Sequence, residues 1–128
     1  VEEFFKLAGI QYQTQMKYKD IDEKYGTNLC SIGKSTKKFD FVFRSPKNNE
    51  LIVMEVNCYG TQGSKPNETA KSYIELNNKI KTMNGVKFVW VTDGNGWNRS
   101  KLNLEDAYDN IEHLYTIKDL EDGILNKL

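Results

Sequence analysis

Two carboxylates and a carboxamide, Asp40, Glu55 and Asn57, stand beside two apolar stretches of the sequence. Residues 38–44 alternate with a period of two and residues 51–56 form an apolar, β-branched run, so both are predicted to be β-strands, the second buried on both faces. In an antiparallel hairpin the start of the first strand lies beside the end of the second, which brings the three polar residues together. Carboxylate oxygens held in this way bind hard divalent cations, which is what cleavage of a phosphodiester needs.

The alternation also predicts which side chains share a face of the sheet. Glu55 and Asn57 lie two residues apart, on the same face as Val53, so the polar pair is expected at the end of its strand. In the first strand the two faces are expected to carry Phe39, Phe41 and Phe43 on one side and Asp40, Val42 and Arg44 on the other.

A carboxylate at a strand end also has a purely structural explanation, because it can cap a turn or pair with a lysine. For a single acid that explanation is the stronger one. An acid on one strand and Glu-x-Asn on the next, all flanked by apolar residues, favour a functional site. Further carboxylates that helices could bring to a metal are Asp20, Asp22, Glu23 and Glu75.

Asp40, the Glu55-Val56-Asn57 triplet and residues 60–73 (GTQGSKPNETAKSY) resemble the DpnII/MboI-type restriction endonucleases, whose active site is a variant of the PD-(D/E)xK nuclease site. The resemblance covers residues 39–120, and GSKPNETA is its most specific part. It implies an α/β, restriction-endonuclease-like αβββαβ core with a central mixed sheet flanked by helices. It also implies a type II site-specific deoxyribonuclease of a restriction-modification system, which uses Mg²⁺ to hydrolyse double-stranded DNA at GATC.

The resemblance assigns roles by position. Asp40 and Glu55 would bind Mg²⁺, and Asn57 would stand where the superfamily usually has a lysine. Asparagine has no charge and is a poor base, so Lys65 or Glu68 would supply part of the missing function, or the metal would activate the water by itself. Glu68 ranks above the other helical carboxylates because its position matches the family motif.

The candidate DNA contacts lie in two loops that are each expected to follow a strand. In the first loop, glycines let backbone amides approach a phosphate, and the helix that follows adds a partial positive charge. In the second loop, packing of Trp97 against the sheet is the alternative to DNA contact. The candidates are Gly63, Ser64, Lys65, Asn67, Trp97 and Arg99.

Formal net charge is zero, but the charge is unevenly distributed. Residues 60–101 carry seven basic and three acidic side chains, whereas residues 102–128 carry two basic and seven acidic ones. A polyanion such as DNA would favour the first region. A palindromic recognition site would suit a homodimer with two-fold symmetry.

A chain of 128 residues suits one compact domain, and we expect residues 1–128 to form a single nuclease catalytic domain. Because the chain begins at Val1 within an apparent helix, the N-terminal part of a longer chain is expected to be absent. No apolar run long enough to span a membrane and no signal peptide is visible. Together with the family resemblance, this implies a cytoplasmic protein of a bacterium or an archaeon. Cys30 and Cys58 form no metal motif, and His113 is expected to be structural.

The remaining elements follow from periodicity and from the positions of glycines. Asn67 is expected to cap the helix that follows it. Helices are predicted at 2–8, 18–25, 68–83, 101–110 and 118–128, and further strands at 10–16, 86–92 and 112–116.

Two other functions remain open from the sequence. One is a non-catalytic DNA-binding domain that kept the fold and lost the lysine. The other is a repair-type nuclease of the same superfamily, or one that acts on RNA, with the same site residues and a different substrate.

Overall fold

The computed structural model describes residues 1–33, 37–60 and 65–128 of the chain. A five-stranded sheet forms its centre, in the order β1 (Tyr12–Lys17), β2 (Lys38–Arg44), β3 (Leu51–Cys58), β4 (Val86–Asp93) and β5 (Leu114–Tyr115). The pairs β1/β2 and β2/β3 are antiparallel, whereas β3/β4 and β4/β5 are parallel. The expectation of an α/β protein with a central mixed sheet is confirmed.

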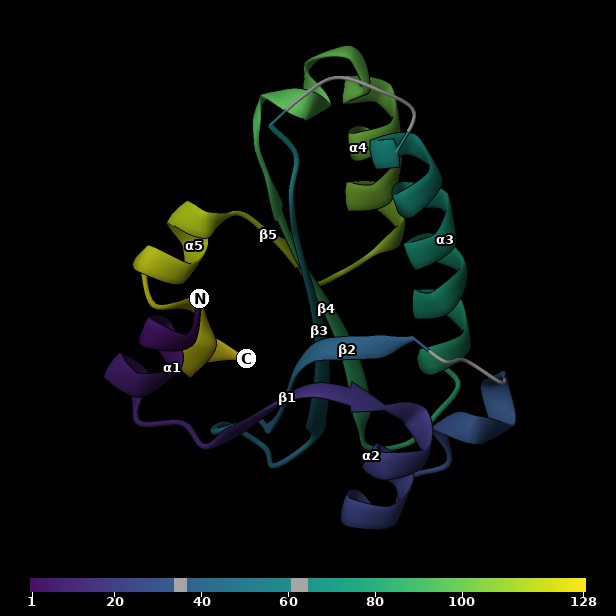
Figure 1. The fold of residues 1–128 in the computed structure, drawn as a ribbon, viewed down its shortest axis with the longest axis vertical. Coiled ribbons are helices and arrows are strands. Elements are labelled where there is room, and N and C mark those ends of the chain that lie inside the picture. The colour runs from purple at the N-terminus through teal and green to yellow at the C-terminus, as the bar shows by residue number, and fades with distance from the viewer. Residues whose placement is uncertain (34–36, 61–64) are drawn as a thin grey trace.

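Helices cover both faces of the sheet (Figure 1). One face carries α3 (Lys65–Ile80) and α4 (Lys101–Asn110), together with α2 (Tyr18–Tyr25) and the short 3₁₀ turn Leu29–Ile32. The other carries α1 (Glu2–Ala8), α5 (Ile117–Glu121) and the 3₁₀ turn Ile124–Lys127. Each layer buries its own apolar cluster, so β3 in the middle of the sheet is covered on both sides. None of the helices in the described ranges has both the length and the apolar character needed to cross a membrane.

Strand β3 shows the two-sided burial expected of it. Residues 51–54 are fully buried and alternate between the two clusters: Leu51 and Val53 face α3, and Ile52 and Met54 face α1 and α5. By the same alternation, Glu55 and Asn57 lie on the α3 face, beyond the last apolar positions. The polar pair is therefore at the strand's end, as predicted.

The register places Asp40 next to Glu55. The last regular pair between β2 and β3 is Phe41 with Met54, so the next position outward sets Asp40 opposite Glu55. There the Val56 amide donates a hydrogen bond to Asp40 Oδ2 at 2.9 Å. Beyond the last regular pair, the two strands are therefore joined by the Asp40 side chain. The predicted proximity of Asp40 and Glu55 is confirmed.

The predicted alternation of β2 is wrong at Phe39. This ring lies in the α3-side cluster and stacks on Tyr18 with centroids 5.4 Å apart, whereas Phe41 lies on the opposite face. The ladder between β1 and β2 omits the pair of Gln15 and Asp40, and Gln15 has a φ of 53°. The pleat is interrupted at this pair, which turns Phe39 to the other side.

The boundaries of two predicted helices are also wrong. Helix α3 begins at Lys65 and not at Glu68, so Asn67 is inside it and not its cap, while Pro66 occupies the first turn, where its missing amide costs nothing. The same helix ends at Ile80, because the amides of Thr82 and Met83 bond carbonyls three residues back and not four. The predicted closing helix 118–128 is divided into two short turns by Gly123, which has a φ of 87°, and the strand predicted at 112–116 has only two residues.

The segments that follow β3 and β4 are in direct backbone contact at the carboxyl ends of these two strands. Tyr59 donates its amide to the Asp93 carbonyl at 2.9 Å, and its own carbonyl accepts the Gly96 amide at 2.8 Å. Gly94, with φ 111° and ψ 158°, passes directly over the Tyr59 backbone, and a Cβ there would overlap the Tyr59 carbonyl. Only glycine fits both the conformation and the space.

We predict that Gly94→Ala destabilises the fold more than Gly123→Ala does. Both positions have positive φ, which costs an L-residue about 1–2 kcal/mol, but a Cβ at 123 would meet no atom within 4 Å. The difference between the two free energies of unfolding, measured in urea, isolates the clash with Tyr59. Equal losses for the two variants would mean that the two segments are not held together as described.

Candidate active site

Glu55 is a carboxylate buried in the core, only 3% exposed. Tyr73 of α3 donates its hydroxyl to Glu55 Oε2 at 3.2 Å, and the Lys37 ammonium lies 3.7 Å from Oε1. Among the described residues Oε1 has no hydrogen-bond partner. Burial raises the pKa of Glu55 to about 8, Lys37 opposes this rise, and the neighbouring Asp40 adds to it.

Asp40 stands half-buried beside it. Its Oδ2 accepts the Val56 amide, and its Oδ1 accepts the side-chain amide of Gln15 at 3.0 Å. Asp40 therefore has the structural role that a carboxylate at a strand end can have. That explanation does not extend to Glu55, because a buried oxygen without a hydrogen bond costs stability and must be justified by something else.

Asn57 is held within a network of aromatic residues. Trp90 Nε1 donates to Asn57 Oδ1 at 3.0 Å, and the Thr92 hydroxyl donates to the Asn57 backbone carbonyl at 2.7 Å. Trp97 Nε1 then donates to the Thr92 hydroxyl at 2.9 Å. Asn57, which by the family resemblance stands where the wider superfamily usually has a lysine, is thus an uncharged side chain whose oxygen already accepts a hydrogen bond.

The two candidates on helix α3 lie apart from this cluster. Lys65 and Glu68 are exposed in the first turn, and within the described ranges neither forms an ion pair or hydrogen bond with Asp40 or Glu55. Asn67 accepts a hydrogen bond from Asn103 at 2.9 Å, which connects α3 to α4. Gly63 and Ser64 lie outside the described residues.

Trp97, one of the candidate DNA contacts, is buried. Trp97 is 5% exposed and packs edge-on against Trp90 and Tyr59, so the alternative given for it, packing against the sheet, is the one found. The physical reason is that the 3₁₀ turn Asn95–Arg99 folds the indole back over the end of β4. Arg99, at the end of the same turn, is exposed.

Among the described residues no third carboxylate joins the pair. In the parts of the chain that the structure describes, no group of three or more His, Cys, Asp or Glu side chains is arranged to hold a metal. Asp22 instead accepts hydrogen bonds from the Thr27 hydroxyl and from the amides of Leu29 and Cys30, so it stabilises the turn after α2.

Sequence reasoning missed three residues of this cluster: Gln15, Lys37 and Tyr73. Gln15 belongs to a segment that only the folded sheet brings next to Asp40, and only the folded sheet brings Lys37 next to Glu55. Tyr73 was visible as part of the apolar face of its helix, but nothing in the sequence showed that its hydroxyl meets a carboxylate. The only sign of this cluster in the sequence was that Lys37 stands three residues before Asp40.

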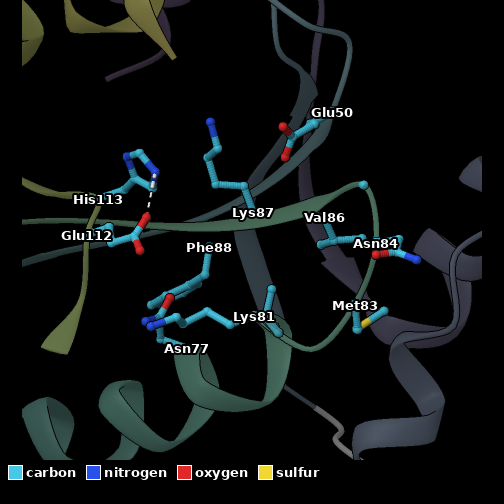
Figure 2. Close-up of a pocket in the computed structure, with 12 residues that line it drawn as sticks. Glu50, Asn77, Lys81, Met83, Asn84, Val86, Lys87, Phe88, Glu112 and His113 are labelled. Carbon is cyan, nitrogen blue, oxygen red and sulfur yellow. Dashed lines mark ion pairs between the residues drawn. The ribbon is translucent and has the colours of Figure 1, made fainter.

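A hollow of about 450 Å³ lies at the other ends of β3 and β4, among Glu50, Lys81, Lys87 and Glu112 (Figure 2). His113, the only histidine of the chain, also lines it. The His113 ring bonds the Tyr115 hydroxyl at 3.0 Å and faces Glu112 at 3.9 Å, and burial lowers its pKa. His113 therefore lies near the amino ends of β3 and β4, at the end of the sheet opposite to Asp40 and Glu55.

Comparison with known proteins gives one consistent result. The family model described as DpnII restriction endonuclease matches residues 1–127. The chain is 39% identical to the type II restriction enzyme DpnII of Streptococcus pneumoniae over 95% of its length, and 34% identical to MboI of Moraxella bovis over all of it. It is 35% identical to MjaIII of Methanocaldococcus jannaschii over 93%. No solved structure matches.

The chain is considerably shorter than these relatives. It spans 43% of DpnII, 43% of MboI and 41% of MjaIII.

We predict that Glu55→Gln stabilises the protein at alkaline pH. Because the pKa of Glu55 rises on folding from 4.5 to about 8, the folded state binds more protons between these values. The contribution of Glu55 to stability is therefore favourable at low pH and is lost as the pH rises toward 8. Glutamine remains neutral, so the difference between variant and wild type in urea unfolding should grow from about pH 5 to about pH 9.

Glu75→Gln, an exposed position on α3, serves as the control. It should follow the wild-type pH profile. Parallel profiles for wild type and Glu55→Gln would contradict the burial of an ionisable group at position 55.

Proposed function

The chain belongs to the DpnII restriction endonuclease family, and from this premise we propose that it carries the phosphodiester-cleaving centre of a type II site-specific deoxyribonuclease. The observation that supports this most strongly is the pairing of Asp40 with Glu55. These two carboxylates lie on adjacent strands, and a buried oxygen of Glu55 lacks a hydrogen-bond partner among the described residues. A buried oxygen of this kind costs stability, and it is expected where a ligand completes the site.

The donor set fits Mg²⁺. This ion prefers hard oxygen ligands and is commonly held by one or two carboxylates, with waters and substrate phosphate completing its shell. Asp40 and Glu55 would supply those carboxylates, so the absence of a third acidic residue in the described ranges agrees with this mode of binding. When bound there, the ion would polarise a phosphoryl oxygen and make a water more acidic.

The residues of the chain have separate tasks in this proposal. Tyr73 and Gln15 orient the carboxylates through their hydrogen bonds to Glu55 and Asp40. The aromatic rings around Tyr73 exclude water from the inner side of the site, since Trp90 and Phe88 pack edge-on against it at 4.9 and 5.6 Å. Asn57 keeps its amide protons as neutral donors, because its oxygen already accepts from Trp90.

The proposed substrate is double-stranded DNA, with GATC as the recognition sequence. Of the seven basic side chains in residues 60–101, Lys65, Arg99 and Lys101 belong to the segments that follow β3 and β4, and they support a polyanionic substrate at this end of the sheet. Lys81 and Lys87 line the hollow at the other end. A homodimer would match the two-fold symmetry of such a sequence.

A non-catalytic DNA-binding domain is the second candidate. The observation that favours it is the uncharged Asn57, whose oxygen is already bonded to Trp90. Metal dependence separates the two candidates, since a pure binding domain gains little from Mg²⁺.

We predict that Asp40→Ala and Glu55→Ala each reduce cleavage by at least about 10²–10³-fold while DNA affinity changes little. Loss of either carboxylate removes a ligand of the catalytic ion, and removal of one preorganised electrostatic group costs about 10²–10³ in rate. The assay uses the full-length protein and long unmethylated duplex DNA, with Mg²⁺ or with EDTA. The ends of discrete fragments give the recognition sequence.

Glu75→Ala, on the exposed side of α3, is the matched control and should cut at the wild-type rate. Wild-type protein that binds DNA and never cuts it would support the binding domain. Undiminished cleavage by Asp40→Ala would show that the site lies elsewhere.

A further inference from the structure

A cation approaches the buried carboxylate from outside the core. In the described residues this cation is Lys37, which directly precedes β2 and lies three positions before Asp40. The Lys37 ammonium is 3.7 Å from Glu55 Oε1 and 4.0 Å from the centroid of the Tyr73 ring. The carboxyl oxygen of Glu55 and the electron-rich face of the Tyr73 ring hold its charge in one place.

The position of Lys37 connects the buried site with solvent. Its side chain is 37% exposed, whereas that of Glu55 is 4% exposed. Lys37 also lines a hollow of about 240 Å³ beside α3, together with Tyr18, Glu75 and Lys79. The side chain of Lys37 therefore lies between solvent and the buried carboxyl group of Glu55.

The other candidates for a positive charge do not reach this point. Asn57 is neutral and bonded to Trp90, and Lys65 is exposed in the first turn of α3 without a contact to the carboxylates among the described residues. A phosphodiester is itself an anion, and two carboxylates repel it. The proposed Mg²⁺ would offset part of this repulsion, and a cation supplied by the protein beside the pair would add to its effect.

We propose that Lys37 is a catalytic residue of this site, with its ammonium in contact with the scissile phosphate beside Asp40 and Glu55. The inference rests on the proposed nuclease function. Lys37 would supply the positive charge that the neutral Asn57 lacks.

Lys37 acts in this reaction as a fixed charge. Water adds its oxygen to phosphorus while the bond from phosphorus to the 3′ oxygen breaks. One water proton ends on the departing 3′ oxygen, and the other is released to solvent as the new 5′-phosphate ionises. Negative charge builds up on the non-bridging oxygens during this exchange, and the ammonium stabilises it without giving or taking a proton.

Lys37→Gln should lower the single-turnover rate of DNA cleavage by about 10²–10³-fold, the usual cost of losing one such group. Lys37→Arg keeps the charge and should recover most of the rate. Lys38→Gln is the matched control, because this exposed neighbour has the same charge and its substitution should leave the rate unchanged. All variants are made in the full-length protein, and circular dichroism checks that each is folded.

Two further measurements separate catalysis from indirect effects. DNA affinity measured without Mg²⁺ should be nearly the same for wild type and Lys37→Gln, since one contact among many contributes little to binding. The rate deficit should persist at about pH 9.5. A deficit that disappears there would mean that Lys37 only keeps Glu55 ionised, and it would overturn the proposal.

The remaining outcomes are also decisive. Equal rates for wild type and Lys37→Gln would overturn this inference and leave the proposed function intact. An arginine variant as slow as the glutamine variant would show that charge at this position is not what matters. Wild-type protein without any cleavage would overturn the proposed function and the inference together.

Discussion

The burial of the Glu55 carboxylate is the constraint on which the rest of this structure depends. A charge removed from water is costly unless hydrogen bonds and opposite charge compensate it. Here Tyr73 supplies a hydrogen bond and Lys37 supplies the charge, but the compensation is incomplete, because one oxygen accepts no hydrogen bond from any described residue and the pKa is raised to about 8. Such an arrangement is expected where a ligand completes the site.

This constraint explains why α3 must lie where it does. The hydroxyl of Tyr73 reaches Glu55 only because its ring is wedged edge-on against Phe88 and Trp90 of the sheet. The same packing places the ring face under Lys37. Apolar packing thus positions both the Tyr73 hydroxyl and the Lys37 ammonium. A substitution that disturbs this packing would therefore change the site as well as the core.

The mixed sheet serves the same purpose. Antiparallel pairing with β2 brings Asp40 to β3, and parallel pairing with β4 aligns Asn57 with Thr92. The segments after β3 and β4 consequently emerge side by side, and Gly94 allows their backbones to touch. If β3 and β4 were antiparallel, their carboxyl ends, and with them the two segments, would lie at opposite ends of the sheet.

Local patterns alone determined much of this protein. The two-residue repeat of residues 38–44 predicted the first strand, and the continuous apolar run of residues 51–56 predicted a strand buried on both faces. The short turn between the two strands predicted that Asp40 lies close to Glu55. The tertiary structure decided the pleat interruption that turns Phe39, the burial of Trp97, and the meeting of Lys37 and Tyr73 with Glu55. These features depend on contacts between segments distant in the chain, which no local pattern encodes, since a side chain's partners are fixed only when the layers pack.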